Sequence, residues 1–179
     1  MRPTRDDTNM AIALAVAKRT TCARRAVGAV ATDADGYVLG TGYNGQYAGS
    51  KHCNEGNPCS GATSPSGTNI DGCSAIHAEQ NLLLHCGDPR KIDTVYVTTS
   101  PCLSCLKLLL GTNTKRIVFK EKYAGSETSA QLWTDSGRIW EHYKEEEEIV
   151  KASTLEKEKF CDSNCVWTDH HPDCAIGKL

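Results

Sequence analysis

The segment from Asp93 to Tyr123 alternates between strand and helix patterns, and it constrains the fold more than any other part of the sequence. "DTVYVTTS" is apolar and β-branched, "PCLSCLKLLLGT" has a helical run of leucines with Pro101 in its predicted first turn, and "KRIVFKEKY" is β-prone again. Strands that alternate with helices build a sheet covered by helices. The sequence therefore predicts an α/β fold with a mixed sheet.

The flanking segments supply the remaining elements. "DDTNMAIALAVAKRTTC" predicts a helix from about Asp7 to Thr20, with Asp6, Asp7 and Thr8 as candidates for its N-cap. The Asp35-Gly36 pair predicts a hairpin between two β-prone runs. Further along, "SAIHAEQNLLLHC" and "SETSAQLWTDSG" predict helices, and "RIWEHYK" predicts a weaker strand.

Two segments do not follow this alternation. Residues 45–73 are rich in Gly, Ser, Asn and Pro and carry cysteines, and so long a loop in a compact domain needs a functional or covalent reason. After Lys144 the chain becomes highly charged, and it closes with "CDSNCVWTDHHPDCAIGKL". We therefore expect one domain over residues 1–145 and a charged, Cys/His-containing extension over residues 146–179.

Composition narrows the classes of protein to consider. No run approaches the roughly 20 apolar residues that cross a bilayer, and "MRPTRDDTNM" lacks the apolar core of a secretory signal. The net charge of -2 gives no general attraction to nucleic acid. We expect a cytoplasmic protein, or one in the host cytoplasm if a phage encodes it, with neither membrane nor nucleic acid as partner. In a reducing compartment, the 10 cysteines favour metal ligation over disulfides.

One pattern of residues carries the chemistry. His77 and Glu79 stand at the start of a predicted helix, and Cys102 and Cys105 follow a strand as Pro-Cys-x-x-Cys. One imidazole and two thiolates leave the fourth position of a tetrahedral zinc for water, as in catalytic sites. That water needs a proton acceptor, a role open to Glu79 if it is not itself a ligand. A lone histidine is usually structural and a lone C-x-x-C is a moderate signal, but the joint pattern is the known zinc deaminase signature.

"HAEQN" at 77 and "PCLSC" at 101, with "TCARRAVGAV", "GYNGQYAG" and "HCNEG", resemble the bacterial and phage deoxycytidylate (dCMP) deaminases of the cytidine deaminase superfamily. The resemblance covers about Met10 to Tyr143. It implies a three-layer α/β/α fold with about five strands, hydrolysis of dCMP to dUMP and ammonia, and a homo-hexamer. It also implies allosteric activation by dCTP and inhibition by dTTP, with Mg²⁺ as a candidate beside the allosteric nucleotide.

The resemblance also implies a role for each matching residue. His77, Cys102 and Cys105 would hold zinc, and Glu79 would carry a proton from the zinc-activated water to N3 of the base and on to the departing amine. Arg24 is the candidate for the 5'-phosphate because a guanidinium fork suits an oxyanion. Arg25 is its less favoured substitute, and a solvated surface arginine is the alternative for Arg24.

The other implied contacts fall into two groups. The backbone at Ala78 and Ser100 would hold the pyrimidine, Asn44 the sugar, and the Tyr123 hydroxyl would add a contact. The allosteric nucleotide would contact the segment Gly42, Tyr43, Asn44 and Gly45. The family's usual smaller residues are replaced by Leu82 and Leu83, and its shorter turn by Gln46 and Tyr47, which leaves the regulation open.

A second metal is predicted from the remaining cysteines. Cys22, Cys53, Cys59 and Cys73 lie outside the catalytic pattern, and four thiolates would close a structural zinc site that joins the first helix to the long loop. His52 could replace one of them, and unpaired buried thiols are the alternative.

Cys86 is interpreted as a small buried hydrophobe. In the C-terminal extension, a mobile terminus is the favoured interpretation, and a third metal site is the alternative for Cys161, Cys165, His170, His171 and Cys174.

Two other functions remain open at this point. Another zinc deaminase, acting on tRNA adenosine or on free nucleosides, shares the signature, although a tRNA enzyme needs a basic groove that the net charge of -2 disfavours. A non-catalytic zinc module that binds nucleic acid or a protein partner is the other alternative. Glu79 argues against the module, because a structural zinc site needs no acid or base beside its ligands.

Overall fold

A five-stranded mixed sheet forms the centre of the computed structural model, which describes residues 2–65, 68–69 and 72–145. The strand order is β2-β1-β3-β4-β5. β1 runs antiparallel to β2 and β3, whereas β3, β4 and β5 are parallel. The strands are β1 (Gly28–Thr32), β2 (Val38–Tyr43), β3 (Thr94–Thr99), β4 (Arg116–Glu121) and β5 (Ile139–His142).

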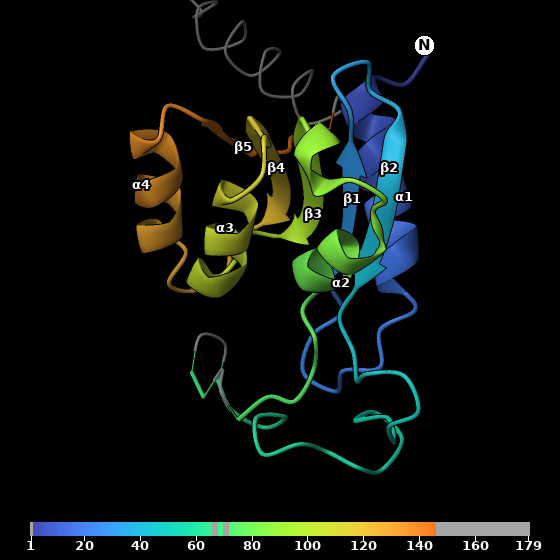
Figure 1. Cartoon of the computed structure of the whole chain (residues 1–179). Helices are drawn as coiled ribbons and strands as arrows, with labels where there is room; N and C mark the ends of the chain where they lie inside the picture. Colours follow the sequence, from blue (N-terminus) through green and yellow to red (C-terminus); the bar gives the residue numbers. More distant parts are fainter. Residues whose placement is uncertain (1, 66–67, 70–71, 146–179) are drawn as a thin grey trace, which may run out of the picture. The chain divides into compact units, whose positions relative to one another are not determined.

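Helices cover both faces of the sheet (Figure 1). On one face α1 packs Met10 and Ala13 against Val30, Tyr96 and Val118. On the other face α2, α3 and α4 enclose the larger apolar core. The helices are α1 (Arg5–Ala17), α2 (Ala78–His85), α3 (Leu103–Leu110) and α4 (Glu127–Asp135), with a 3-10 turn η1 (Pro89–Lys91) that the sequence did not predict. The predicted three-layer α/β/α fold is confirmed.

The start of α1 differs from the prediction. Thr4 is the N-cap: its hydroxyl accepts a hydrogen bond from the Asp7 N–H (3.1 Å), and the Asp7 carboxylate accepts one from the Thr4 N–H (2.8 Å). The prediction that Asp6, Asp7 or Thr8 caps this helix was therefore wrong. Asp6 instead pairs with Arg116 of β4 at 2.6 Å, a tertiary contact that local sequence does not reveal.

Two helices are shorter than predicted, and both begin at residues of the predicted zinc site. His77 is the N-cap of α2 and Cys102 is the N-cap of α3. Pro101 precedes this cap and does not lie in the first turn of α3 as predicted. Both side chains thus stand at the positive end of a helix, where unpaired N–H groups favour anionic ligands such as thiolates.

Two glycines of the β1–β2 hairpin allow helices to approach the sheet closely. A Cβ on Gly28 would lie 2.0 Å from the Ala13 carbonyl oxygen of α1. A Cβ on Gly42 would lie 2.2 Å from the Ala78 carbonyl oxygen and 2.4 Å from the Leu82 nitrogen of α2. Gly42 therefore fixes how far the first turn of α2 stands from the sheet.

The directions of the strands bring the start of β1 and the ends of β3 and β4 to one edge of the sheet. Because β1 is antiparallel to β3, the start of β1 (Ala29 opposite Val97) lies beside the end of β3, and the end of β4 is level with it (Thr99 opposite Glu121). Ligand sites of open α/β sheets form outside the carboxyl ends of parallel strands. The residues that precede β1 and follow β3 and β4 are therefore placed around one site.

The long loop leaves and returns to the sheet at this same edge. Gly45 and Ile76 form an isolated antiparallel bridge, with N–H to O distances of 3.1 and 2.8 Å. Between them, the described residues form turns but neither helix nor strand, as predicted. Arg24 reaches this loop from the α1–β1 connection, donating through Nη2 to the carbonyl oxygens of Pro65 and, at 3.0 Å, Thr68.

Some predictions concern residues that the structure does not describe. The extension assigned to residues 146–179, with its cysteines and histidines, lies outside the described residues, so the boundary after residue 145 stays a prediction.

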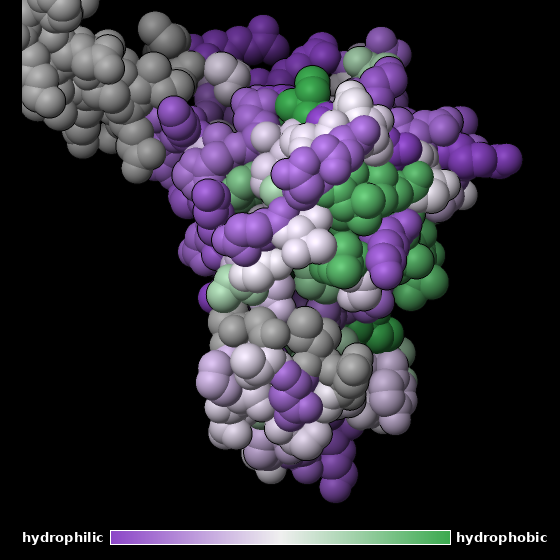
Figure 2. All heavy atoms as spheres, turned by 90° about the vertical axis from the view of Figure 1, so that its left-hand side faces the viewer, coloured by the Kyte–Doolittle hydropathy of each residue, from purple (hydrophilic) through white to green (hydrophobic). Residues whose placement is uncertain are grey.

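Within the described part, none of the helices is long and apolar enough to cross a membrane. The face shown in Figure 2 carries apolar patches among polar ones, and exposed apolar side chains of α3 and α4 include Leu103, Leu108 and Leu132.

Candidate active site

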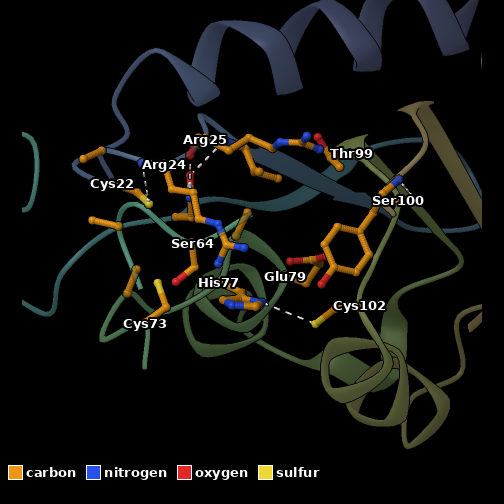
Figure 3. Close-up of a pocket in the computed structure, with 17 residues that line it drawn as sticks. Cys22, Arg24, Arg25, Ser64, Cys73, His77, Glu79, Thr99, Ser100 and Cys102 are labelled. Atoms are coloured by element: carbon orange, nitrogen blue, oxygen red, sulfur yellow. Dashed lines mark hydrogen bonds between the residues drawn. The ribbon is translucent and has the colours of Figure 1, made fainter. Parts of the chain in front are cut away.

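A pocket of about 320 Å³ opens at the shared edge of the sheet (Figure 3). Its floor comes from the N-terminal ends of α2 and α3, which contribute His77, Glu79 and Cys102. The connection from α1 to β1 and the ends of β2 and β3 form its walls, and the long loop adds Ala62, Ser64 and Cys73. The pocket thus brings together segments that the sequence separates widely.

His77, Cys102 and Cys105 meet with the spacing of zinc ligands. The His77 Nδ1 lies 3.4 Å from the Cys102 Sγ and 3.3 Å from the Cys105 Sγ. Zinc–nitrogen and zinc–sulfur bonds of normal length at a tetrahedral angle would separate such atoms by about 3.6 Å. Among the described residues, this is the one group of three His, Cys, Asp or Glu donors that lie within 4.8 Å of one another. The three side chains therefore fit zinc through the Nδ1 nitrogen.

The electrostatics of this trio favour a thiolate. A hydrogen bond donated by the Cys105 thiol, with others from His77 and Ser104, lowers the pKa of Cys102 to about 3. The same contact with Cys102, together with burial, raises the pKa of Cys105. The hydrogen bond to Cys102 raises the pKa of His77. The Cys102 sulfur is therefore an anionic donor of the kind that a divalent cation requires.

Glu79 lies in the first turn of α2 and points into the same pocket (Figure 3). Its side chain is buried, with a relative exposure of 4%. Burial raises the pKa of the Glu79 carboxyl above its ordinary value, and the charge on Cys102 adds to this effect. A raised pKa makes the protonated form of this carboxyl easier to reach, which suits a group that takes up and then releases a proton.

The two neighbouring arginines behave differently. The Arg24 side chain points toward the loop, where it has the carbonyl partners described above. The Arg25 side chain extends across the opposite wall toward Thr99 (Figure 3). Its Nη1 is buried and has no hydrogen-bond partner among the described residues. Only Arg24 was favoured as the phosphate ligand from the sequence, and that role stays a prediction.

The other predicted substrate contacts also line the pocket. Asn44 is buried; its Oδ1 accepts from the Val27 N–H (2.8 Å), and its Nδ2 donates to the Arg25 carbonyl oxygen (2.8 Å). The Ser100 hydroxyl accepts from the Tyr123 N–H at 2.8 Å. Burial raises the pKa of the Tyr123 hydroxyl, the charge on Cys102 raises it further, and the nearby Arg24 and Arg25 act to lower it. The predicted roles of Asn44, Ala78, Ser100 and Tyr123 in binding stay predictions.

The segment predicted to bind an allosteric nucleotide has mainly internal contacts in the described chain. Gly42 packs on α2, the Arg19 guanidinium lies over the Tyr43 ring at 5.6 Å, and Gly45 pairs with Ile76. Of the four residues, only Asn44 lines the pocket. Allosteric binding by this segment stays a prediction.

The four remaining loop and helix-end cysteines lie near one another. Cys53 and Cys59 have their sulfurs 3.8 Å apart, and two thiolates on a tetrahedral zinc would be separated by about 3.8 Å. Burial acts to raise the pKa of Cys59, but N–H groups of Ser74 and Gly61 and the thiols of Cys53 and Cys73 lower it to about 7. Burial raises the pKa of Cys73, and negative charge on Cys59 and Cys22 raises it further.

The four sulfurs do not form a compact metal site. No three of them lie within 4.8 Å of one another in the described chain. His52, the alternative ligand, has a buried Nδ1 without a hydrogen-bond partner among the described residues. The four-cysteine zinc site therefore stays a prediction, supported by the Cys53–Cys59 separation.

Thr99 and Ser64 were not predicted from the sequence, although both line the pocket. Thr99 ends β3, so its place beside Ser100 follows once the strand is located. Ser64 has no comparable signal, because a loop without periodic pattern does not reveal which residue faces inward.

The family profile described as the cytidine and deoxycytidylate deaminase zinc-binding region matches residues 3–121. The deoxycytidylate deaminase of Schizosaccharomyces pombe is 35% identical over 139 residues, which are 76% of this chain and 43% of that protein. The deoxycytidylate deaminase of Mycobacterium phage D29 is 39% identical over 126 residues, which are 68% of this chain and 98% of that protein. The chain thus spans less than half of the yeast relative and nearly all of the phage relative.

Solved structures have the same fold. The dCMP deaminase of cyanophage S-TIM5, crystallised with dCMP and dUMP, superposes with a TM-score of 0.63 and 25% sequence identity. The match covers 80% of this chain and 99% of the phage chain.

Proposed function

The chain belongs to the zinc-binding cytidine and deoxycytidylate deaminase family, and from this premise we propose that it hydrolyses dCMP to dUMP and ammonia. The observation that carries the proposal is the cluster of the His77, Cys102 and Cys105 donors, with buried Glu79 in the same pocket as His77 and Cys102. Positive side chains on the same pocket favour a nucleotide over a nucleoside. The deoxycytidylate deaminases of S. pombe and phage D29 support this choice of substrate.

The proposed reaction assigns a separate task to each side chain. Zinc held by His77, Cys102 and Cys105 would lower the pKa of a bound water so that it can attack at neutral pH. Glu79 takes a proton from the attacking water and delivers it to N3 of the cytosine as the C4–O bond forms. Glu79 then moves the remaining hydroxyl proton to the amino group, the C4–N bond breaks, and ammonia leaves with a C4 carbonyl in place.

The base would lie between the ends of α2 and β3. Ala78 and Ser100 would contact the pyrimidine edge through their backbones, and the Ser100 N–H already donates to the Glu121 carbonyl oxygen at 2.8 Å, which leaves its carbonyl for the ligand. Asn44 would contact the sugar and Tyr123 would add a hydroxyl. Each of these contacts is part of the proposal.

Ammonia release from dCMP tests the proposed function. The zinc-loaded protein is expected to deaminate dCMP with a kcat/KM at least about tenfold above that for deoxycytidine, because charge-assisted contacts to the phosphate add binding energy to the transition state. The measurement is a coupled ammonia assay on dCMP, CMP, deoxycytidine and an adenosine-containing tRNA stem-loop.

Each alternative predicts a different result in this assay. Equal kcat/KM values for dCMP and deoxycytidine would mean that the phosphate is not recognised. Release from the tRNA stem-loop alone would identify a tRNA deaminase. No release from any substrate by protein with full zinc content would favour a non-catalytic zinc module.

We also propose that Cys22, Cys53, Cys59 and Cys73 hold a structural zinc. Cys59→Ser is expected to lower the zinc content by about one ion per chain, because a closed structural site uses all four ligands. Zinc is measured by plasma mass spectrometry on the full chain. Cys86→Ser is the matched control, since Cys86 is a buried cysteine at the C-cap of α2 outside both groups, and its zinc content is expected to equal that of the wild type. Unchanged zinc in Cys59→Ser would rule out this site.

Regulation, assembly and location are proposed on the family resemblance. dCTP would activate and dTTP would inhibit, with Mg²⁺ beside the nucleotide at the segment Gly42 to Gly45, and the ammonia assay repeated with each nucleotide measures both effects. A homo-hexamer would give a partner to the exposed leucines of α3 and α4, and sedimentation measures its mass. The cytoplasm, or a host cytoplasm, is the proposed location.

A further inference from the structure

The Cys102 sulfur has a close polar neighbour that is not one of the proposed zinc ligands. The Ser104 hydroxyl oxygen lies 3.1 Å from the Cys102 Sγ. The His77 Nδ1 is also close, at 3.4 Å, but it would bind the same metal as the sulfur (Figure 3). With a metal bound, the Ser104 hydroxyl is therefore a neighbour that can still form a hydrogen bond with this sulfur.

The direction of this hydrogen bond follows from the chemistry of the two groups. A cysteine binds zinc as a thiolate, which has no proton to donate. A serine hydroxyl carries one proton and can rotate it toward an acceptor. The Ser104 hydroxyl is therefore the donor, and the Cys102 sulfur is the acceptor. Hydrogen bonds to a charged acceptor are stronger than those between neutral groups.

The start of α3 brings the two residues together. Cys102 is the N-cap of this helix, and Ser104 is its second residue, after Leu103. Cys102 is buried, whereas Ser104 is exposed. Ser104 does not line the pocket, so it can contact the sulfur but not a ligand held in the pocket.

A hydrogen bond to a metal-bound sulfur changes the electron density that the sulfur gives to the metal. The donated proton draws density from the thiolate, and the metal stays more electron-poor. An electron-poor zinc is a stronger Lewis acid, which is the property that the proposed reaction uses. The Ser104 hydroxyl can therefore affect the reaction without touching the substrate.

We infer that the Ser104 hydroxyl tunes the catalytic metal by donating a hydrogen bond to the Cys102 thiolate. Ser104 is a positioning residue in this role, because it acts through Cys102. The effect on turnover rests on the proposed function. The effect on the metal needs only that His77, Cys102 and Cys105 bind one.

Absorption of the cobalt-loaded full chain tests the inference. Co²⁺ in place of zinc gives a sulfur-to-cobalt charge-transfer band whose energy depends on the electron density of the sulfur. Ser104→Ala is expected to move this band to longer wavelength, because the sulfur loses a hydrogen bond and becomes more electron-rich. Ser104→Thr keeps a hydroxyl and is expected to have the wild-type band. Cobalt held by the loop cysteines absorbs equally in these proteins and cancels in their difference spectra.

Turnover gives a second measure, in the zinc-loaded full chain. Ser104→Ala is expected to lower kcat for dCMP by about 2- to 10-fold, the range for one lost hydrogen bond. The KM for dCMP is expected to stay unchanged, because Ser104 lies outside the pocket. Ser104→Thr is expected to have the kcat of the wild type.

Thr128→Ala is the matched control for the loss of a hydroxyl at the start of a helix. Thr128 is the second residue of α4, and it is exposed and outside the pocket, as Ser104 is. The cobalt band and kcat of this variant are expected to equal those of the wild type. Thermal unfolding measures whether each variant is folded.

The outcomes separate this inference from the proposed function. The inference is overturned if Ser104→Ala keeps the wild-type band, if Ser104→Thr shifts the band as far as Ser104→Ala, or if the wild type has no such band. A shifted band with unchanged kcat would overturn the effect on turnover. If the band shifts as expected but the wild type releases no ammonia from dCMP, the tuning of the metal stands and the proposed reaction does not.

Discussion

Glu79→Gln is expected to lower kcat for dCMP by about 10²- to 10⁴-fold, the usual contribution of a general acid–base group. The glutamine side chain has the same shape but cannot accept the proton of the attacking water. Because Glu79 is buried, bulk water cannot readily replace it as a proton carrier. Single-turnover ammonia release at saturating dCMP measures the effect.

Zinc content distinguishes a proton carrier from a ligand in this experiment. Glu79→Gln is expected to keep the zinc bound at His77, Cys102 and Cys105, as measured by plasma mass spectrometry. Glu127→Gln is the matched control, because Glu127 lies in the first turn of α4 but is exposed and outside the pocket. A loss of zinc together with activity in Glu79→Gln would instead identify Glu79 as a ligand.

Gly42→Ala is expected to destabilise the fold by about 1–3 kcal/mol, the cost of forcing an added methyl group into a packed position. The new Cβ would lie 2.2 Å from the Ala78 carbonyl oxygen and 2.4 Å from the Leu82 nitrogen, so the backbone of α2 must move. Because that turn carries Ala78 and Glu79, kcat for dCMP is expected to fall as well. Calorimetric melting measures the stability, at roughly 2–4 °C per kcal/mol for a chain of this size.

Gly87→Ala controls for the loss of glycine flexibility. A Cβ at Gly87 would have no atom within 4 Å, and its φ is not in the left-handed region, so the change is expected to be neutral or slightly stabilising. A melting temperature of Gly42→Ala equal to that of the wild type would show that α2 can move away from the hairpin without cost.

The sequence predicted the layers of the fold because its local patterns agree with the tertiary structure. The hairpin turn at Asp35-Gly36 and the apolar run of β3 both appear where they were expected. The start of α1 was mispredicted because two nearby acids compete for the cap. Asp7 completes the capping box with Thr4, whereas Asp6 is taken by Arg116 across the sheet, and only the folded structure distinguishes them.

The candidate site was predictable to the extent that its residues form a spaced pattern. His77, Glu79 and Cys102 meet in one pocket because helix caps and a strand end bring them there. The difference between Arg24 and Arg25 was not predictable. It depends on the hydrogen bonds from Arg24 to the carbonyl oxygens of Pro65 and Thr68 in the long loop. That loop has no periodic pattern from which the contact could be predicted.

The bridge between Gly45 and Ile76 joins the two ends of the long loop, and so it affects how this family can vary. A segment that leaves and re-enters the domain at one pair of residues can gain or lose length while β2 and α2 keep their positions. The entropic cost of such a change grows only with the logarithm of the loop length. Evolution can therefore alter what covers the pocket, and with it the choice of substrate, without remaking the residues that carry out the reaction.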